Sequence, residues 1–481
     1  MKISLIQPSR NNLKYLKWSY DSIRKNQGDH EVEICVADDF SDKDETWRWC
    51  QEKMNYDPHF KAIRNEGPTR LGHTILYDRL VNEVATNDIC MIYHADMYLC
   101  PGALDAIEKH MYGEKFKPIN GWDEERFNYG VDVMRLEGLH DYALMDQNEY
   151  PNILNDMMDK WGVPTHKPIP KTIVSLTRIE PPLHPPGPEK LLEDFGIEPE
   201  EFNEEGLLEF VDEARSKPFG IGSPNNKTTE GIFAPWAFWK KDFQEIGGHD
   251  PIFAPQSKED TDIFNRFHLN GVKFVQTWEG FVYHMTCRGS RFADGAKRNP
   301  DGQVFMKNRE TDEWLKQNQK STREFIRKWG HYCKHDEYMK PIVPPKYDIG
   351  FVVENCDDKL VEALEPWCSN IYLDEDGDNA IRTYYIINER QNTSFNLSER
   401  VLPYDNEKQN EILVYINGKT FNQQDFNIIN RLTEIIENSD GELGEFEIGN
   451  LKLDITNLNT YEKELIKCQH IDVKNAEPQE N

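Results

Sequence analysis

Apolar and polar positions alternate in two distinct ways over the first 110 residues. Short apolar runs, typical of buried strands, are separated by longer segments with helical spacing, such as Leu13, Leu16 and Tyr20. The runs predict strands at Lys2–Gln7, Glu31–Ala37, Phe60–Asn65 and Ile89–Tyr93. The longer segments predict helices at Asn12–Lys25, Asp44–Met54 and His73–Ala85. This order predicts an α/β fold with a mostly parallel sheet and right-handed crossovers.

The pattern changes at residues 113–230, where prolines cluster and an acidic run occupies Glu198–Glu205. A segment of this length is too long for an ordinary loop, so we expect helices within it, at Tyr150–Trp161 and Leu207–Ala214. We interpret the segment as an insertion beside a binding site, where it would help to select a substrate.

Strand and helix patterns resume after residue 230. They predict strands at Ile232–Phe238, Val272–Thr277 and Gly280–His284, a turn at Phe243–Gly248 and a helix at Asp260–Asn270. These elements would complete a first domain at residues 1–302. Within it, Trp236 and Trp239 are candidates either for stacking on a sugar ring or for core packing.

The C-terminal part begins with a helical segment and a Pro-rich linker at residues 303–345. A new strand–helix alternation follows, at Asp348–Val353, Leu360–Leu364, Ile371–Leu373 and Thr383–Ile387, with later strands at Glu411–Ile416 and Leu451–Ile455 around a helix at Phe426–Glu437. We expect a small α/β domain at 346–473 and a disordered tail at 474–481. This domain offers no catalytic cluster, and binding of an acceptor or partner and self-association into a homo-oligomer are its candidate roles.

The chain has 481 residues and a formal net charge of -29, from 85 acidic and 56 basic side chains. This charge disfavours a nucleic-acid-binding protein, because such proteins neutralise phosphates. The first apolar run is too short for a signal peptide, and no run approaches the roughly 20 residues of a membrane helix. The nine cysteines lack a CxxC pair, which favours reduced thiols and a cytoplasmic location.

The apolar run Ile89–Tyr93 leads directly into His94 and Asp96. In an extended segment these two side chains point to the same side, and the carboxyl ends of strands in open α/β sheets are where ligands bind. An imidazole and a carboxylate there suit Mn²⁺ or a similar cation. The alternative is a polar strand end that only begins a loop.

Two acidic clusters are further candidates. Asp38 and Asp39 follow the second strand and could bind a nucleobase or ribose, or else the acidic residues after them could cap the next helix. The run Lys258–Asp262 precedes a helix and could place a general base in a cleft. Its alternative role is stabilisation of the helix dipole.

His284 ends the last predicted strand of the first domain, and Arg288 and Arg291 follow it. The histidine could supply a third metal ligand, and the arginines could bind phosphates in bidentate fashion. Their alternative is ordinary surface charge. None of these clusters is specific alone, and their order along the chain is what makes them informative.

Together, these segments resemble inverting glycosyltransferases of family 2, which have the GT-A fold. The matching segments are Ile6–Asn11, Val36–Asp42 with the "DDxS" pattern, Ile92–Met97 followed by Pro101–Leu104, and Ile246–Asp250 followed by Glu259–Asp262, Arg266 and Gly271. Trp329-Gly330 is also similar to related transferases. The resemblance covers about residues 1–335 and does not reach the C-terminal domain.

The resemblance implies transfer of a sugar from a nucleoside diphosphate sugar (a UDP- or GDP-sugar) to a saccharide hydroxyl, with inversion and with Mn²⁺ or Mg²⁺. It implies Asp260 as the base assisted by Glu259, and Asp96 and His284 as metal ligands. The residues expected at the nucleotide sugar are Pro8, Ser9, Arg10, Asp38, Asp39, Arg70, His94, Arg288 and Arg291.

One position departs from the family pattern. His94 replaces the first Asp of the DxD metal motif, so it could contact a ribose, a phosphate or water instead of the metal. Two other functions remain open on the sequence: a sugar-1-phosphate nucleotidyltransferase, although the loop at Pro8–Asn11 lacks its glycines, and a non-catalytic glycan-binding protein with the same fold.

Overall fold

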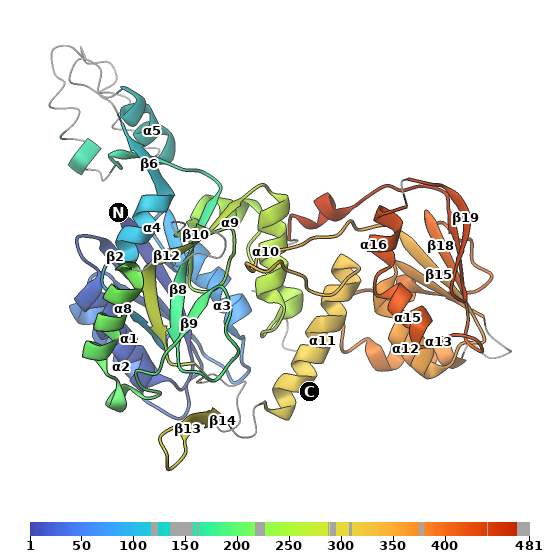
Figure 1. The fold of residues 1–481 in the computed structure, drawn as a ribbon, viewed down its shortest axis with the longest axis horizontal. Helices are drawn as coiled ribbons and strands as arrows, with labels where there is room; N and C mark the ends of the chain where they lie inside the picture. The colour runs from blue at the N-terminus through green and yellow to red at the C-terminus, as the bar shows by residue number, and fades with distance from the viewer. Residues whose placement is uncertain are drawn as a thin grey trace.

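Figure 1 shows a computed structural model in which a large N-terminal α/β unit and a smaller C-terminal α/β unit flank the long helix α11 (Asp312–Trp329). The structure describes residues 1–116, 124–134, 156, 158–160, 163–216, 227–286, 288, 295–306, 310–374, 380–439 and 441–468. In this described part of the chain, no helix has the length and apolar character needed to cross a membrane. The predicted tail at 474–481 lies outside the described residues.

The first half of the large sheet is parallel and follows the predicted order. Its strands are β1 (Lys2–Ser9), β2 (Glu31–Asp39), β3 (Phe60–Asn65) and β4 (Ile89–Ile92), in the spatial order β3-β2-β1-β4. The connecting helices are α1 (Leu13–Asn26), α2 (Thr46–Tyr56) and α3 (His73–Arg79), the last continued by a π-helix at Leu80–Val84. These elements confirm the predicted βαβ pattern, with boundaries within a few residues.

The second half of the sheet is mixed and contains a strand that the sequence did not predict. β11 (Trp236–Trp239) runs antiparallel to both β4 and β8 (Thr172–Glu180), and β12 (Lys273–His284) runs parallel to β8. β8 lies within residues 113–230 and is buried at every position. β12 is one strand with an irregularity between Thr277 and Phe281, where two strands were predicted.

Shorter elements complete this unit. The strands are β5 (Met97–Leu99), β6 (Tyr112–Lys115), β7 (His166–Pro168), β9 (Lys190–Leu192), β10 (Thr228–Thr229), β13 (Ala296–Arg298) and β14 (Val304–Met306). The helices are α4 (Ala103–Met111), α5 (Glu124–Met134), α8 (Glu204–Ser216), α9 (Lys240–Glu245) and α10 (Glu259–Leu269). α9 corrects the predicted turn, which begins only after this short helix. The predicted helix at Tyr150–Trp161 lies largely outside the described residues.

Helices cover both faces of the large sheet. Apolar side chains of α1, α2 and α4 pack on one face, with Leu16, Trp49 and Ile107 among them. Side chains of α3, α9 and α10 pack on the other face. Trp236 and Trp239 are buried between these layers, which excludes them as exposed platforms for a sugar and assigns them to core packing. Among the described elements, the strand ends and their loops are therefore the places that this layering leaves uncovered.

The C-terminal unit has its own sheet and core. Its strands are β15 (Ile349–Glu354), β16 (Asn370–Leu373), β17 (Val401–Pro403), β18 (Ile412–Asn417), β19 (Gly444–Ile448) and β20 (Leu451–Ile455), in the order β17-β16-β15-β18-β20-β19. The helices are α12 (Asp358–Leu364), α13 (Ala380–Glu389), α14 (Leu397–Arg400), α15 (Gln423–Ile429) and α16 (Leu432–Glu437). The small α/β pattern predicted from the sequence is present.

Buried charges join α11 to the C-terminal unit. Arg327 of α11 binds Glu365 with an Nη2–Oε2 distance of 2.8 Å and Glu324 with an Nη1–Oε1 distance of 2.7 Å, and all three side chains are fully buried. Arg400 binds the other oxygen of Glu365 at 2.6 Å. Ion pairs withdrawn from water depend strongly on each partner, because a remaining charge cannot be solvated.

We therefore expect Arg327→Met to lower the free energy of unfolding by about 3–5 kcal/mol, since it leaves buried Glu324 without this cation and Glu365 with Arg400 in place of two cations. Urea denaturation followed by circular dichroism would measure this. Arg431→Met is the matched control, because Arg431 is exposed and its 3.4 Å pair with Glu434 lies at the surface. Equal effects of the two variants would contradict a structural role for the buried network.

Candidate active site

Strand pairing brings distant residues together at one edge of the large sheet. β4 leads into the turn that carries His94 and Asp96, and β5 returns from it to pair antiparallel with the end of β12. In this pairing His284 lies opposite Met97, and the Met285 amide donates to the carbonyl oxygen of Asp96 at 3.0 Å. The backbone itself thus places His284 beside the His94–Asp96 turn.

His94, Asp96 and His284 form a cluster that could hold a metal ion. One ligand atom from each side chain lies within 4.8 Å of the others, and the Nε2 of His284 is 3.4 Å from Oδ1 of Asp96. The centroids of the His94 and His284 rings are 5.5 Å apart. Two nitrogens and one carboxylate are a donor set that fits Mn²⁺ and similar divalent cations. The structure therefore gathers His94 with the two predicted ligands, although its sequence position departs from the DxD pattern.

A carboxylate that the sequence did not suggest orients His284. Glu180, at the end of β8, accepts a hydrogen bond from Nδ1 of His284 at 2.8 Å. Glu180 is itself bound by Arg178 at 3.1 Å and Lys190 at 3.5 Å. A carboxylate on the far nitrogen of a ligating histidine fixes the ring and raises its basicity. The sequence carried no signal for Glu180 because β8 itself was not predicted.

The pKa values of the two histidines in the cluster are shifted in opposite directions. Burial lowers the pKa of His284, but the carboxylates of Asp96 and Glu180 outweigh it and raise the value to about 9. Burial, and then the charge of His284, lower the pKa of His94 to about 3. Burial raises the pKa of Asp96, yet His284 outweighs it and the value is lowered. At neutral pH His94 and Asp96 are therefore in the states that bind metals, a neutral imidazole and an ionised carboxylate, whereas His284 must release a proton to become a ligand.

The acidic residues at the start of α10, which are Glu259, Asp260 and Asp262, differ in their contacts. Asp262 is fully buried and bound by Arg266 at 2.8 Å, by the Trp329 indole at 2.9 Å and by Lys328 at 2.6 Å. These contacts make Asp262 a structural residue that ties α10 to α11.

Glu259 and Asp260 face a different environment from that of Asp262. Oε1 of Glu259 is 2.5 Å from Nε2 of His73, and its Oε2 is buried with no hydrogen-bond partner among the described residues. Burial, and then the neighbouring charge of Glu259, raise the pKa of Asp260 to about 6. A carboxylate with a pKa near neutrality suits a general base.

Two histidines near this acidic pair were not singled out from the sequence. His73 begins α3 and binds Glu259, and its charge also contributes to the lowered pKa of His94, after burial and His284. His249 is buried, with Nδ1 2.8 Å from Oδ1 of Asp78, and its charge helps to lower the pKa of Glu259, behind that of His73 and against the larger effect of burial. The charge of His73 thus acts both on Glu259 and on His94, which links the acidic pair electrostatically to the His94–Asp96–His284 cluster.

The end of β2 carries Asp38 and Asp39, which differ in their contacts. Asp39 accepts hydrogen bonds from the amides of Leu71 and Gly72 at 3.0 and 2.9 Å, and from the Asn65 side chain at 2.8 Å. Asp39 therefore holds the loop that leads into α3. Asp38 accepts from the Ser41 amide at 3.1 Å, and its Oδ2 forms an ion pair with Nε of Arg64 at 3.2 Å. Both carboxylates are therefore engaged within the protein, Asp39 by backbone amides and Asp38 by one amide and one cation.

The other residues predicted at the nucleotide sugar lie on several separate segments. Pro8 and Ser9 end β1, and Ser9 lies opposite Asp38 in the strand register. Arg70 lies on the loop before α3, with its Nε 3.7 Å from Oδ2 of Asp39. Burial lowers the pKa of Arg70, and the nearby charge of Arg10 adds to this effect.

The two arginines after β12 differ in what the structure shows of them. Arg288 pairs with Glu198 at 3.2 Å and donates to the carbonyl of Ile197, so its charge is already engaged. Arg291 lies outside the described residues. The structure thus brings Arg10 and Arg70 close to each other but does not leave Arg288 free.

The strand order, the layered helices and the cluster at the ends of β4 and β12 define a GT-A fold. The family model for glycosyl transferase family 2 matches residues 4–121, which run from β1 to beyond β6 and include Asp38 and Asp96. This part of the chain is therefore similar to glycosyltransferase family 2, in agreement with its motifs.

Solved structures with similar folds share little sequence with this chain. Residues 1–349 of TarS from S. aureus are 13% identical over 59% of this chain and 60% of that one, with a TM-score of 0.32. A structure of GalNAc-T7 with UDP, GalNAc and Mn²⁺ is 12% identical over 59% of this chain and 43% of that one, with a TM-score of 0.34. This chain therefore spans less than two thirds of the length of either of these two proteins. No curated protein matches the chain.

We expect Asp39→Ala to destabilise the protein, because it removes the acceptor of two backbone amides, one of them buried, at about 1–3 kcal/mol for each buried donor left unpaired. Urea denaturation would show a lower midpoint. Asp29→Ala is a suitable control, since Asp29 is exposed. Unchanged stability combined with lost UDP binding would contradict the assignment and indicate instead that Asp39 contacts the nucleotide.

Proposed function

We propose that this protein is a glycosyltransferase that moves a sugar from a nucleoside diphosphate sugar to a saccharide hydroxyl, with inversion and with the help of a divalent cation. The observation that carries the proposal is the His94–Asp96–His284 cluster, with the Glu259–Asp260 pair as a second group suited to catalysis, in a chain whose residues 4–121 match family 2. A cation held by the cluster would stabilise the charge of the leaving group, and a carboxylate of the acidic pair would take the proton of the nucleophile.

In this proposal Asp96 and His284 hold the cation, with His94 as a third ligand. Glu180 positions His284 through its Nδ1. A divalent cation at this place, Mn²⁺ or Mg²⁺, supplies positive charge that stabilises a departing nucleoside diphosphate. GalNAc-T7 was crystallised with UDP and Mn²⁺, which supports the proposal of a UDP-sugar and manganese here.

Asp260 is the proposed base. Its carboxylate takes the proton of the acceptor hydroxyl as the hydroxyl oxygen attacks the anomeric carbon, and the bond from that carbon to the diphosphate oxygen breaks on the opposite face. Attack opposite the leaving group inverts the anomeric centre. Glu259 is a positioning residue, held by His73 at 2.5 Å, and its charge keeps the pKa of Asp260 raised, in addition to burial.

The donor nucleotide is proposed to lie at the ends of β1 and β2. Pro8, Ser9 and Asp38 would contact the base and ribose. Arg10 and Arg70 would neutralise the diphosphate. Arg288 is paired with Glu198, so it could bind the diphosphate only if that ion pair were broken.

We further propose a reducing, cytoplasm-like compartment, because the eight cysteines in the described residues are all free thiols. For the C-terminal unit, acceptor or partner binding and self-association are retained as proposed roles.

Glu180→Gln should weaken Mn²⁺ binding by about 10- to 100-fold, because it removes the carboxylate that orients a ligating histidine. Asp96→Ala should abolish metal-dependent UDP binding. Calorimetric titration of the full chain with Mn²⁺, and with UDP in its presence, would measure both effects. Glu209→Gln, an exposed change on α8, serves as the control. Unchanged binding in Asp96→Ala would remove this cluster from the metal site.

Asp260→Asn should abolish sugar transfer while UDP binding survives. For the wild-type chain, the rate should fall as the pH drops below about 6, because protonation of Asp260 removes the base. Release of UDP or GDP from a panel of donor sugars, with and without Mn²⁺, would be followed across pH. Asp312→Asn, an exposed acidic residue in the first turn of another helix, is the matched control. Full activity of Asp260→Asn would refute its role, and no release from any donor would favour a glycan-binding protein.

A further inference from the structure

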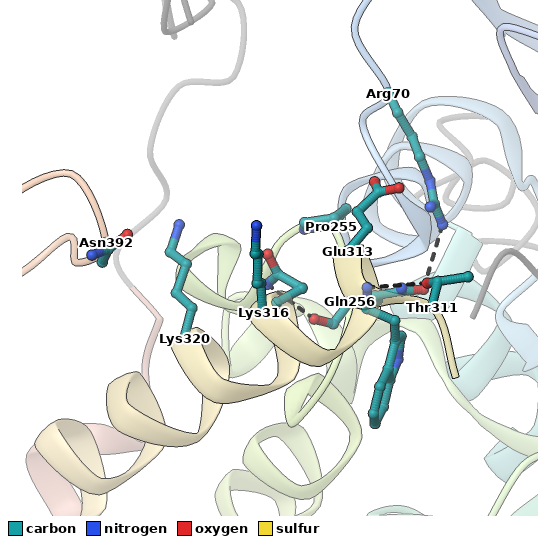
Figure 2. A pocket seen from close by; sticks show the side chains of 10 residues that line it. Arg70, Pro255, Gln256, Thr311, Glu313, Lys316, Lys320 and Asn392 are labelled. Carbon is teal, nitrogen blue, oxygen red and sulfur yellow. Dashed lines mark hydrogen bonds between the residues drawn. The ribbon is translucent and has the colours of Figure 1, made fainter. Parts of the chain in front are cut away.

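A pocket of about 230 Å³ lies where the two units of the chain meet. Its walls come from the loop before α3, from the segment before α10, from the first half of α11 and from the loop after α13. Figure 2 shows the side chains that the argument uses: Arg70, Gln256, Glu313, Lys316, Lys320 and Asn392. The pocket is therefore the place where the C-terminal unit, through Asn392, approaches the candidate active site.

Two lysines of α11 face this pocket together. Lys316 and Lys320 are four residues apart, and Figure 2 shows both side chains extending in the same direction from the helix. Like charges at this spacing destabilise a helix slightly. Within the described ranges neither ammonium group forms an ion pair, although the chain carries 85 acidic and 56 basic side chains. An unpaired pair of cations in so acidic a protein indicates a site for an external anion.

Arg70 adds a third cation from the opposite wall. Its Nη2 makes a long, 3.4 Å contact with Oε1 of Gln256, and its Nε is 3.7 Å from Oδ2 of Asp39. Glu313 is the carboxylate that lines the same pocket. Since Asp39 already offsets the charge of Arg70, the excess positive charge of the pocket comes from Lys316 and Lys320 against Glu313.

The position of the pocket connects it to the acceptor side of the site. Pro255 and Gln256 form one wall and lie directly before α10, which carries Asp260. α11 is fastened to this segment, because Nε2 of Gln317 donates to the carbonyl of Gln256 at 3.2 Å and Oγ of Ser321 donates to the same oxygen at 3.3 Å. An anion bound by Lys316 and Lys320 would thus lie at a fixed place relative to the proposed base.

We infer that this pocket binds an anionic substituent of the acceptor saccharide, a carboxylate, sulfate or phosphate, held by Lys316 and Lys320. The inference rests on the proposed transferase function, and it makes an acidic glycan the acceptor class. The pocket would hold the acidic group while a neighbouring hydroxyl reaches Asp260.

Calorimetric titration of the full chain with hexagalacturonic acid, a heparin-derived hexasaccharide and neutral maltohexaose tests the site. At least one acidic probe should bind and maltohexaose should not. The double variant Lys316→Ala/Lys320→Ala should bind that probe about five- to tenfold more weakly, because each exposed ion pair contributes modestly, and its binding should depend less on salt. Its thermal stability should not fall, since the change removes a like-charge pair.

Lys359→Ala/Lys419→Ala is the matched control, because it removes the same charge from exposed positions outside the pocket. Equal weakening in both double variants, or binding of no acidic probe, would overturn the inference. Loss of UDP binding in the α11 variant would also overturn it and assign the pocket to the donor diphosphate. Acidic probes that bind to a chain that releases UDP or GDP from no donor sugar would refute the proposed function and leave the anion site standing.

Discussion

The pairing of β12 with β8 on one side and β5 on the other is the constraint on which the candidate site depends. It aligns the ends of three segments that are far apart in the chain, so that Glu180, His284 and Asp96 meet. His284 and Glu180 are separated by 104 residues. Buried charges at such a junction are costly unless they are paired, and here each one has a partner. The metal-capable cluster is therefore a consequence of strand register.

The helix α11 connects the two units through contacts on both of its sides. On one side Lys328 and Trp329 bind Asp262 of α10, and on the other Arg327 binds Glu365 of the C-terminal unit. These contacts are buried on both sides of the helix. Through Asn392, the C-terminal unit also lines the pocket that Lys316 and Lys320 face.

Much of the N-terminal half could be predicted because its strands are apolar and its helices have regular spacing. The strand at residues 172–180 was not predicted, because several of its buried residues are polar. Its polar residues, such as Thr177, Arg178 and Glu180, are buried in contacts with residues about 100 positions later in the chain, or in ion pairs. A local pattern cannot reveal partners of that kind. The helix after β11 was similarly missed, because α9 spans only six residues.

The sequence by itself determined the βαβ order, the family resemblance and the identity of Asp96, Asp260 and His284 as candidates, since these depend on local spacing and residue type. Tertiary structure alone decided how neighbouring acids differ. Asp39 is taken up by backbone amides and Asp262 by cations, whereas burial beside Glu259 raises the pKa of Asp260 to about 6. It also placed His94 within the cluster and left Lys316 and Lys320 facing a pocket. The physical reason is that solvation, pairing and pKa depend on neighbours in space, which the order of residues does not specify.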